Sequence, residues 1–351
     1  MALHQSPSKK LHLLREMIRI RRIEQRCAKE YCLGSMAGWL VLSIGQEGTP
    51  VAARSIMGPD DHTISGVRGI GAAIAAGLSP ASIMAELMGK SGGCSSGKGG
   101  NFSLFSPAHR HWGCFPIAAA QTPLALGLSF ALKYQQTEGV VFCYLGDGAV
   151  NQGVFHETLN LAGLFDIPTV FVLENNKFAK GTSVRRSSAF KDHLARRAEA
   201  YDIDWNLASG WDMDSLLTKL TEARERALQK FRATVLEVAT YRYYGFNIAD
   251  ANHKKYRTPE EIEFHKEHRD PIRHWADQLT TVGLLTPEIE KEMHETARAE
   301  ALAASDFASN SPPPTPPTPP TPADLLDHVY WETDHSTPAS QQGRHFFNDE
   351  A

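Results

Sequence analysis

Apolar positions come in continuous runs along the middle of the chain. The runs at 140–145, 169–173 and 234–239 predict buried strands. Between the first two, the apolar pattern of 154–164 predicts a helix. A strand, a helix and a second strand in this order form a unit whose two strands lie parallel. The pattern therefore predicts an α/β fold with a mostly parallel sheet flanked by helices.

Glycines and polar residues directly follow two of these strands. Gly146-Asp147-Gly148 comes after the first, and Asn175-Asn176 after the second, so one crossover separates Asp147 from Asn176. The carboxyl ends of parallel strands are where open sheets bind ligands. Carboxylate and amide oxygens suit Mg²⁺, whereas glycines and a helix amino terminus suit phosphate. This spacing predicts a site where Mg²⁺ holds a diphosphate.

The amphipathic pattern of residues 9–33, near the amino terminus, predicts a helix. Arginines lie on the side opposite its apolar residues, and we interpret this charged side as solvated rather than as a nucleic-acid patch. The apolar side carries Leu11, Leu14, Met17 and Ile18.

Residues 34–116 are glycine-rich and predicted to be irregular, apart from a helix near 80–88. The glycines at 89–100 indicate a loop that lies close to a ligand, with a flexible surface loop as the alternative. Residues 66–71 look like a dinucleotide-binding turn. No convincing apolar strand precedes them and their spacing departs from GxGxxG, so we do not assign a nicotinamide site there.

Helices are also predicted at about 259–285 and 287–308, on the outside of the fold. Thr258 is expected to cap the first helix, with Glu261 reaching back to the cap residue.

We expect one domain over residues 1–310. Residues 311–322 are rich in proline and threonine and predict a stiff polyproline linker. The C-terminal tail segment, 323–351, is short and partly aromatic, so we expect it to dock on the body or on a partner.

Composition limits the classes of function. The chain has 351 residues, 42% of them hydrophobic, and a net charge of −4, which argues against binding dominated by nucleic-acid phosphates. No secretory signal is visible, and the apolar window 117–132 is too short and polar for a membrane span, so it predicts a buried helix. The five cysteines lack metal-binding spacing and favour reduced thiols in the cytoplasm.

The Gly-Asp-Gly segment followed by Asn-Asn resembles the thiamine-diphosphate motif. Continued through Gly153, Glu157 and Asn160, it resembles the alpha subunit of 2-oxo acid dehydrogenases, the decarboxylating component of pyruvate, branched-chain and acetoin dehydrogenase complexes. Further matches follow in the family's order over about residues 11–305. They are 45–48, 97–100, 240–243, Asp250, 256–257 and 270–271.

The resemblance implies thiamine diphosphate and Mg²⁺ as cofactors. Mg²⁺ would be bound by Asp147, Asn176 and the backbone oxygen of Phe178. The resemblance further implies that the Gly146 segment, with Gly148, Ala149 and Arg68, holds the diphosphate, and that Pro116, Ile117 and Ala118 contact the aminopyrimidine.

The same resemblance implies a partner. In the family the glutamate that activates the cofactor comes from a separate beta subunit, and we expect two alpha and two beta chains with the cofactor between them. This chain alone should then be catalytically incomplete, with a small 2-oxo acid as substrate and neither nucleic acid nor membrane as partner.

The chain departs from the family at four positions where the family has histidines around the substrate channel. They are Val41, Ile70, Ser103 and Phe246 here. Val67 replaces a tyrosine that precedes the diphosphate-binding arginine, and Asn247 replaces a serine that is phosphorylated in animal members. Histidines carry protons near neutral pH, so their loss puts proton delivery to lipoamide in doubt. The other histidines considered, His109, His111, His156 and His253, are interpreted as surface or packing residues, and no catalytic residue is assigned.

Our leading hypothesis is a 2-oxo acid decarboxylase subunit that passes the decarboxylated fragment to a non-lipoyl acceptor, by carboligation. One alternative is an ordinary pyruvate or branched-chain 2-oxo acid dehydrogenase alpha subunit. Others are a non-catalytic cofactor-binding assembly subunit and, more weakly, a transketolase-like half-subunit.

Overall fold

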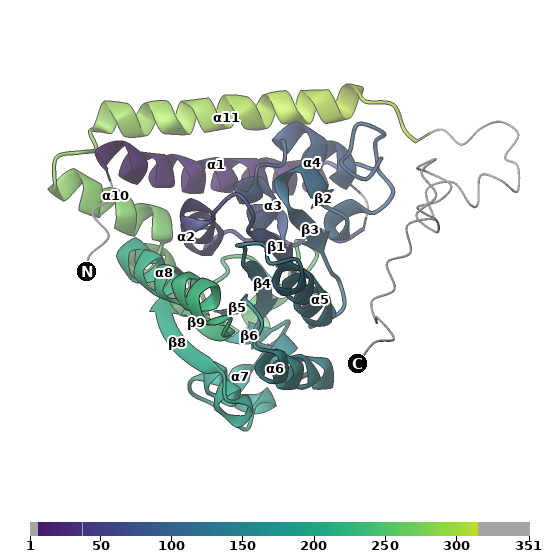
Figure 1. Cartoon of the computed structure of the whole chain (residues 1–351). Helices are drawn as coiled ribbons and strands as arrows, with labels where there is room; N and C mark the ends of the chain where they lie inside the picture. Colours follow the sequence, from purple (N-terminus) through teal and green to yellow (C-terminus); the bar gives the residue numbers. More distant parts are fainter. Residues whose placement is uncertain (1–5, 37, 315–351) are drawn as a thin grey trace, which may run out of the picture. The chain divides into compact units, whose positions relative to one another are not determined.

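The computed structural model describes residues 6–36 and 38–314, and Figure 1 shows their arrangement. The fold is α/β, as predicted, with helices on both faces of a mostly parallel sheet. The strands are β1 (His62–Ser65), β2 (Phe105–Ser106), β3 (His111–Cys114), β4 (Val141–Gly146), β5 (Thr169–Asn175), β6 (Phe178–Ala179), β7 (Thr182–Ser183), β8 (Asp204–Ser209) and β9 (Thr234–Ala239). The helices are α1 (Pro7–Cys32), α2 (Gly48–Ile56), α3 (Ile70–Ala76), α4 (Pro80–Leu87), α5 (Gln121–Tyr134), α6 (Gly153–Phe165), α7 (Val184–Ser187), α8 (Met213–Lys230), α9 (Pro259–His268), α10 (Pro271–Thr281) and α11 (Pro287–Asn310).

The main sheet has the order β2-β3-β1-β4-β5-β9-β8, and its neighbours are parallel except for β2 with β3. β1 lies beside β4. The chain continues from β1 to strands on one side of this pair, and from β4 to strands on the other side. This reversal creates a switch point between β1 and β4, where open parallel sheets hold their ligands.

Successive residues of the central strands point to opposite faces and supply two cores. On β4, Phe142 and Tyr144 join the core under α1, α2 and α8, whereas Cys143 and Leu145 join the core under α5 and α6. Both faces are covered, which explains why these strands read as continuous apolar runs rather than as alternating ones.

The region 34–116 is more regular than predicted. It contains α2, α3, β1 and β3, which are short elements with little room to show periodicity. Because β1 immediately precedes 66–71, our statement that no strand comes before that turn is wrong. The departure from GxGxxG spacing is then the remaining argument against a nicotinamide site.

The helix predicted over 259–285 is interrupted, because Asp270 caps a new helix, α10. Its carboxylate accepts hydrogen bonds from the backbone N–H groups of Ile272 and Arg273, at 2.9 and 3.0 Å. Pro271 occupies the first turn, where its missing N–H costs nothing.

The cap of α9 is confirmed in part. The Thr258 hydroxyl accepts a hydrogen bond from the Glu261 N–H at 3.1 Å. The Glu261 carboxylate does not reach back, however, and instead accepts from the Tyr241 hydroxyl at 3.1 Å.

The arginine side of α1 is only partly solvated, whereas we predicted a solvated face: Arg15 is exposed, but other arginines are partly covered. Helix α11 packs along α1 (Figure 1), and Arg19 donates to Glu300 at 2.8 and 2.9 Å. The Arg21 side chain is 14% exposed and pairs with Glu47 and Asp270. These carboxylates are distant in sequence, so the local pattern of α1 cannot reveal them.

The glycine-rich loop after α4 folds around a carboxylate of the chain itself. Glu86 is fully buried and accepts hydrogen bonds from the backbone N–H groups of Ser95, Gly97, Gly99 and Gly100, at 2.8 to 3.0 Å. Gly97 has a φ of +74°, which lets the backbone turn its N–H groups inward. The ligand expected from these glycines is thus the Glu86 side chain.

Glu86→Gln is expected to lower the free energy of unfolding by about 2–4 kcal/mol. Glutamine keeps the shape but removes the charge and places an NH₂ donor against backbone donors. Urea unfolding of the cofactor-free chain measures this loss. Glu138→Gln, at an exposed loop position, is the matched control, and equal small effects for both variants would refute the role of Glu86.

The first residues of the proline-rich segment contact the body. Ser311 is buried, and the Ser91 N–H donates to the Pro312 carbonyl at 2.9 Å. The linker therefore does not begin as a free spacer at residue 311. Residues 315–322 of the predicted linker and the tail 323–351 lie outside the described residues, so this part of the domain assignment stays a prediction.

Within the described ranges, no helix is both long and apolar enough to cross a bilayer. The window 117–132 overlaps α5, which is half-exposed rather than buried. Ala125 and Leu132 face the core, whereas Leu124 and Phe130 are 46% and 44% exposed. All cysteines are free, and a cytoplasmic location stays a prediction.

Candidate active site

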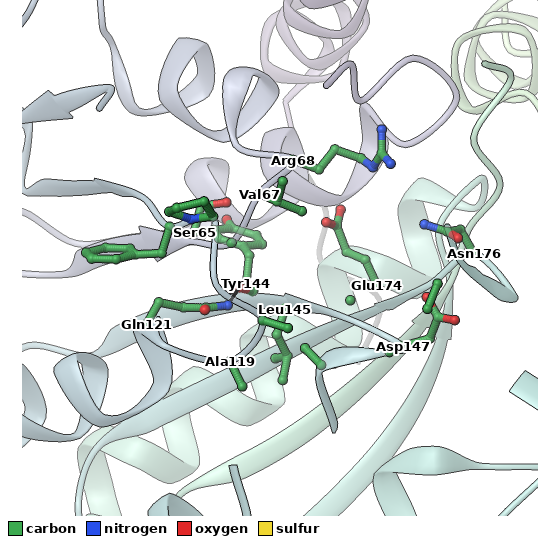
Figure 2. A pocket seen from close by; sticks show the side chains of 18 of the residues that line it. Ser65, Val67, Arg68, Ala119, Gln121, Tyr144, Leu145, Asp147, Glu174 and Asn176 are labelled. Carbon is green, nitrogen blue, oxygen red and sulfur yellow. Dashed lines mark hydrogen bonds between the residues drawn. The ribbon is translucent and has the colours of Figure 1, made fainter. Parts of the chain in front are cut away.

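A cavity of about 350 Å³ lies at the switch point, where β1, β4 and β5 end (Figure 2). It is lined by the segments that follow these strands, by the start of α5 and by Phe246. Every residue that the sequence assigned to the cofactor lines it. These residues are Arg68, Pro116, Ile117, Ala118, Gly146, Asp147, Gly148, Ala149, Asn176 and Phe178.

Asp147 stands at the end of β4 with an unused carboxylate oxygen. The residue is 4% exposed, and its Oδ2 has no hydrogen-bond partner among the described residues. Burial raises the pKa of this carboxyl to about 6. A buried carboxylate oxygen without a partner is costly unless a cation sits beside it.

Asn176 follows β5 and is 6% exposed. Its side-chain NH₂ donates to Gln46 at 3.1 Å, and its Oδ1 accepts from the Phe178 N–H at a long 3.3 Å. A carbonyl oxygen has two lone pairs, so this weak bond leaves Oδ1 with capacity for a metal.

Arg68 and Glu174 bring a cation and a titratable carboxyl group to the same cavity (Figure 2). The Arg68 guanidinium donates to the carbonyls of Leu42 and Phe246, and burial lowers its pKa to about 10, so it is cationic at neutral pH. Burial raises the pKa of Glu174 to about 7, although the nearby Arg68 charge and Gln46 act in the opposite direction.

Gly148 has to be a glycine for a local reason. A Cβ at this position would lie 2.4 Å from the Cβ of Ala179, far inside van der Waals contact. The close approach of these two segments narrows the cavity between the ends of β4 and β5.

The open side of the cavity is formed by Pro116, Ile117 and Ala118. All three are exposed in this chain, and the Ile117 side chain is 71% exposed. The part of the cavity assigned to the aminopyrimidine therefore faces outward.

The matches at 240–257 form a buried network that holds the segment carrying Phe246. Arg242 donates to the Lys180 carbonyl at 2.6 Å and the Tyr244 carbonyl at 3.0 Å. Asp250 accepts from the Phe246 N–H at 2.8 Å and the Tyr256 hydroxyl at 2.6 Å. The network connects this segment to the rim at Lys180.

The four family histidine positions do not all reach the cavity. Phe246 lines it, whereas Val41 and Ile70 are fully buried and do not, and Ser103 lies in the loop held by Glu86. We expected an apolar wall formed by all four residues. Of these four, Phe246 is the one that lines the cavity. In the described chain no histidine lines the cavity, and His111 is buried against Thr63.

Sequence reasoning missed Gln46, Gln121, Glu174 and Lys180, which also line the cavity. Gln46 belongs to the family match Gly45-Gln46-Glu47, just before α2, and this match could have indicated it. Gln121 was hidden in an apolar window, yet its NH₂ donates to the Tyr144 carbonyl at 2.7 Å.

Comparison with known proteins gives the family. A sequence model of the dehydrogenase E1 component matches residues 15–317. The chain belongs to this family. It is 36% identical to the pyruvate dehydrogenase E1 component subunit alpha of Rickettsia bellii over 300 residues, covering 86% of this chain and 91% of the relative. The Zymomonas mobilis protein of that name is 37% identical over 312 residues, covering 89% and 87% of the two chains. A human testis-specific mitochondrial form is 34% identical over 309 residues, covering 87% and 77%.

The family identifies the chain as an alpha subunit of the decarboxylating component of a 2-oxo acid dehydrogenase, a class that uses thiamine diphosphate. The residues present fit a metal-bound diphosphate. A partnerless buried carboxylate oxygen at Asp147 suits a cation, and Arg68 and Lys180 supply positive charge for phosphate.

A further buried acid lies close enough to Arg68 for the two charges to interact. Glu24, on α1, accepts hydrogen bonds from the N–H and the hydroxyl of Ser43, at 2.9 and 2.7 Å. Its Oε2 has no hydrogen-bond partner among the residues that the structure describes. Burial raises its pKa from the ordinary 4.5 to about 8, so the folded chain keeps it protonated at neutral pH.

This shift predicts a pH-dependent stability. The contribution of Glu24 is fully present below pH 4.5 and is lost as pH rises toward 8, because the unfolded chain releases the proton earlier. Glu24→Gln should reduce this dependence, by on the order of a few kcal/mol between pH 5 and 8. Urea unfolding over that range compares the two chains, and parallel pH profiles would contradict the assignment.

Proposed function

We propose that this chain binds thiamine diphosphate through Mg²⁺ and, with a beta subunit, decarboxylates pyruvate or a similar 2-oxo acid for a dehydrogenase complex. The observation that carries the proposal is the pair Asp147 and Asn176 at the ends of adjacent strands, in one cavity, with an unpartnered oxygen on Asp147. The names of the relatives support pyruvate as the substrate.

In this proposal the residues of the chain bind and orient. Asp147, Asn176 and the Phe178 carbonyl hold Mg²⁺, while Arg68 and the backbone at Gly148 and Ala149 hold the diphosphate. When bound, thiamine diphosphate supplies the electron sink for loss of CO₂. The apolar side chain of Phe246 limits the access of water to the adjoining part of the cavity.

The lining of the cavity also supports a role for a partner subunit, which would supply the glutamate that activates the cofactor. Asp147 and Glu174 are the carboxylates that line the cavity in the described chain, and both belong to the ends of β4 and β5, where we propose that the metal binds. The activating glutamate would come from the beta subunit, across the open side at Ile117.

An exposed apolar surface extends from Ile117, at that opening, over α5 and α6, and we call it the α5–α6 surface. Phe130 on α5 contacts Phe165 on α6, with ring centroids 5.8 Å apart. Large exposed apolar patches mark interaction sites. We propose that the beta subunit covers this surface, in an assembly of two alpha and two beta chains. Its residues are Ile117, Leu124, Phe130, Leu161, Leu164 and Phe165.

The experiment that tests this function uses the chain alone and co-produced with a beta chain. We expect release of labelled CO₂ from carboxyl-labelled pyruvate by the pair, dependent on thiamine diphosphate and Mg²⁺, and essentially none from the single chain. Full-rate decarboxylation by the single chain would rule out the shared site.

Phe246 favours a second candidate, carboligation to a non-lipoyl acceptor. It lines the cavity in place of a family histidine, and the ring of Trp39 packs edgewise on it, with centroids 5.7 Å apart. Reduction of lipoamide needs a proton at the leaving sulfur, and this wall supplies none.

The two candidates differ in the step after decarboxylation. An ordinary dehydrogenase subunit produces NADH briskly when its lipoyl acyltransferase and dihydrolipoyl dehydrogenase are added. A carboligase produces CO₂ without NADH and forms a new carbon–carbon bond with an added aldehyde, which mass spectrometry detects.

A further inference from the structure

Asn101 links two backbone segments that are far apart in sequence. Its side chain is 3% exposed, its Oδ1 accepts a hydrogen bond from the Val41 N–H at 3.0 Å, and its NH₂ donates to the Val67 carbonyl at 3.1 Å. A buried amide that satisfies one donor and one acceptor in two different segments fixes the distance between them.

The two linked residues are the direct neighbours of an active-site contact. Arg68 follows Val67, and its guanidinium donates to the carbonyl of Leu42, which follows Val41. Asn101 therefore spans the same gap as the Arg68 side chain, one residue earlier on each segment. The second acceptor of Arg68 is the Phe246 carbonyl, at 3.2 Å.

Asn101 is itself held rigidly. It sits in a short 3₁₀ turn, Gly100–Phe102, and the preceding loop is fixed by the Glu86 carboxylate through the N–H groups of Gly99 and Gly100, at 2.9 and 3.0 Å. Its amide is thus presented to the two segments from a loop anchored on α4.

The linked positions, 41 and 67, are both valines, so neither side chain can form a hydrogen bond across the gap. Val41 is also fully buried and does not reach the cavity. A backbone link through Asn101 does not depend on those side chains.

We propose that Asn101 is a positioning residue for Arg68, which it holds at the geometry that receives the diphosphate. This inference rests on the proposed function, in which Arg68 contacts that group. Asn101 does not line the cavity and acts through Arg68.

A double-mutant cycle on the full chain tests the inference. Asn101→Ala, Arg68→Ala and the double variant are titrated with Mg²⁺–thiamine diphosphate by calorimetry, and their cofactor-free stabilities are measured by urea unfolding. Asn101→Ala should weaken binding roughly 10- to 100-fold. In the Arg68→Ala background it should cause little further loss of affinity, because the group that it positions is gone.

Two further variants guard against misfolding and general loss of stability. Asn101→Asp keeps the size and the acceptor for Val41 but loses the donor to Val67, and it replaces Asn101→Ala in the cycle if the alanine chain does not fold. Ser129→Ala removes a buried hydrogen bond to Thr169, 2.6 Å long, at the opposite end of the sheet. This control should lose stability but keep its cofactor affinity.

The outcomes separate the inference from the function on which it rests. Unchanged affinity in Arg68→Ala would overturn the diphosphate assignment of Arg68, and with it the inference. Weakened binding in Arg68→Ala with fully additive losses in the double variant, or with no loss in either Asn101 variant, would overturn the inference alone.

Discussion

Asp147→Ala is expected to abolish Mg²⁺-dependent binding of thiamine diphosphate while the chain stays folded. Oδ2 of Asp147 has no partner in the described chain, and burial raises the pKa of the carboxyl to about 6. The carboxylate therefore costs stability in the cofactor-free chain and is useful only beside a cation. Without this carboxylate, Mg²⁺ has one ligand fewer and is held less tightly, so the charge of the diphosphate is less well compensated. We expect a loss of affinity of roughly a hundredfold or more.

Calorimetry with Mg²⁺ and thiamine diphosphate measures this loss, and urea unfolding reports whether the variant folds. Asp147→Asn is the matched control, because it keeps the shape and one oxygen ligand but not the charge, and it should bind with intermediate affinity. Asp147→Ala should be at least as stable as the parent chain without cofactor. An affinity equal to that of the parent would remove Asp147 from the metal site.

The central sheet and the nearness of Asp147 to Asn176 could be predicted because their signals are local. β4, β5 and β9 are long apolar runs, and their register places Gly146 opposite Glu174. The rule that ligands bind at the carboxyl ends of parallel strands then brings Asp147 and Asn176 together, without any knowledge of the rest of the fold.

The errors concern contacts between distant segments. The charged side of α1 reads as solvated because the partners of Arg19 and Arg21 include Glu300 and Asp270, hundreds of residues later. The loop glycines read as a ligand site because Glu86 looks like an ordinary helical carboxylate. The sequence shows that there is a glutamate at position 86, but it does not show which backbone N–H groups will donate hydrogen bonds to it.

The residues that the resemblance assigns to the cofactor gather in one cavity, but the four residues that it assigns to the wall of the substrate channel do not. Residues carried over for the cofactor all line one cavity, because the backbone that builds it follows the strands directly. Val41 and Ile70 are both buried, and burial depends on tertiary packing, such as that of α3 against α1, which the motif does not show. The chemical effect of the lost histidines therefore rests mainly on Phe246.

Leu164→Glu is expected to prevent assembly with the beta subunit and thereby to abolish decarboxylation. Leu164, on α6, is 67% exposed in the single chain, so a glutamate there should change the stability of that chain little. If a partner covers the α5–α6 surface, the same glutamate is buried without a partner charge, at a cost of several kcal/mol. The site then lacks the carboxylate that the partner supplies, and activity falls with assembly.

Leu302→Glu is the matched control, since Leu302 is 44% exposed on α11, at the opposite end of the described body in Figure 1. Light scattering of co-produced chains and release of labelled CO₂ from pyruvate are measured for both variants. We expect the assembly and activity of the parent for Leu302→Glu and unassembled, inactive chains for Leu164→Glu. A fully assembled and active Leu164→Glu protein would mean that the beta subunit binds elsewhere, because a charge buried in an interface without a partner is costly.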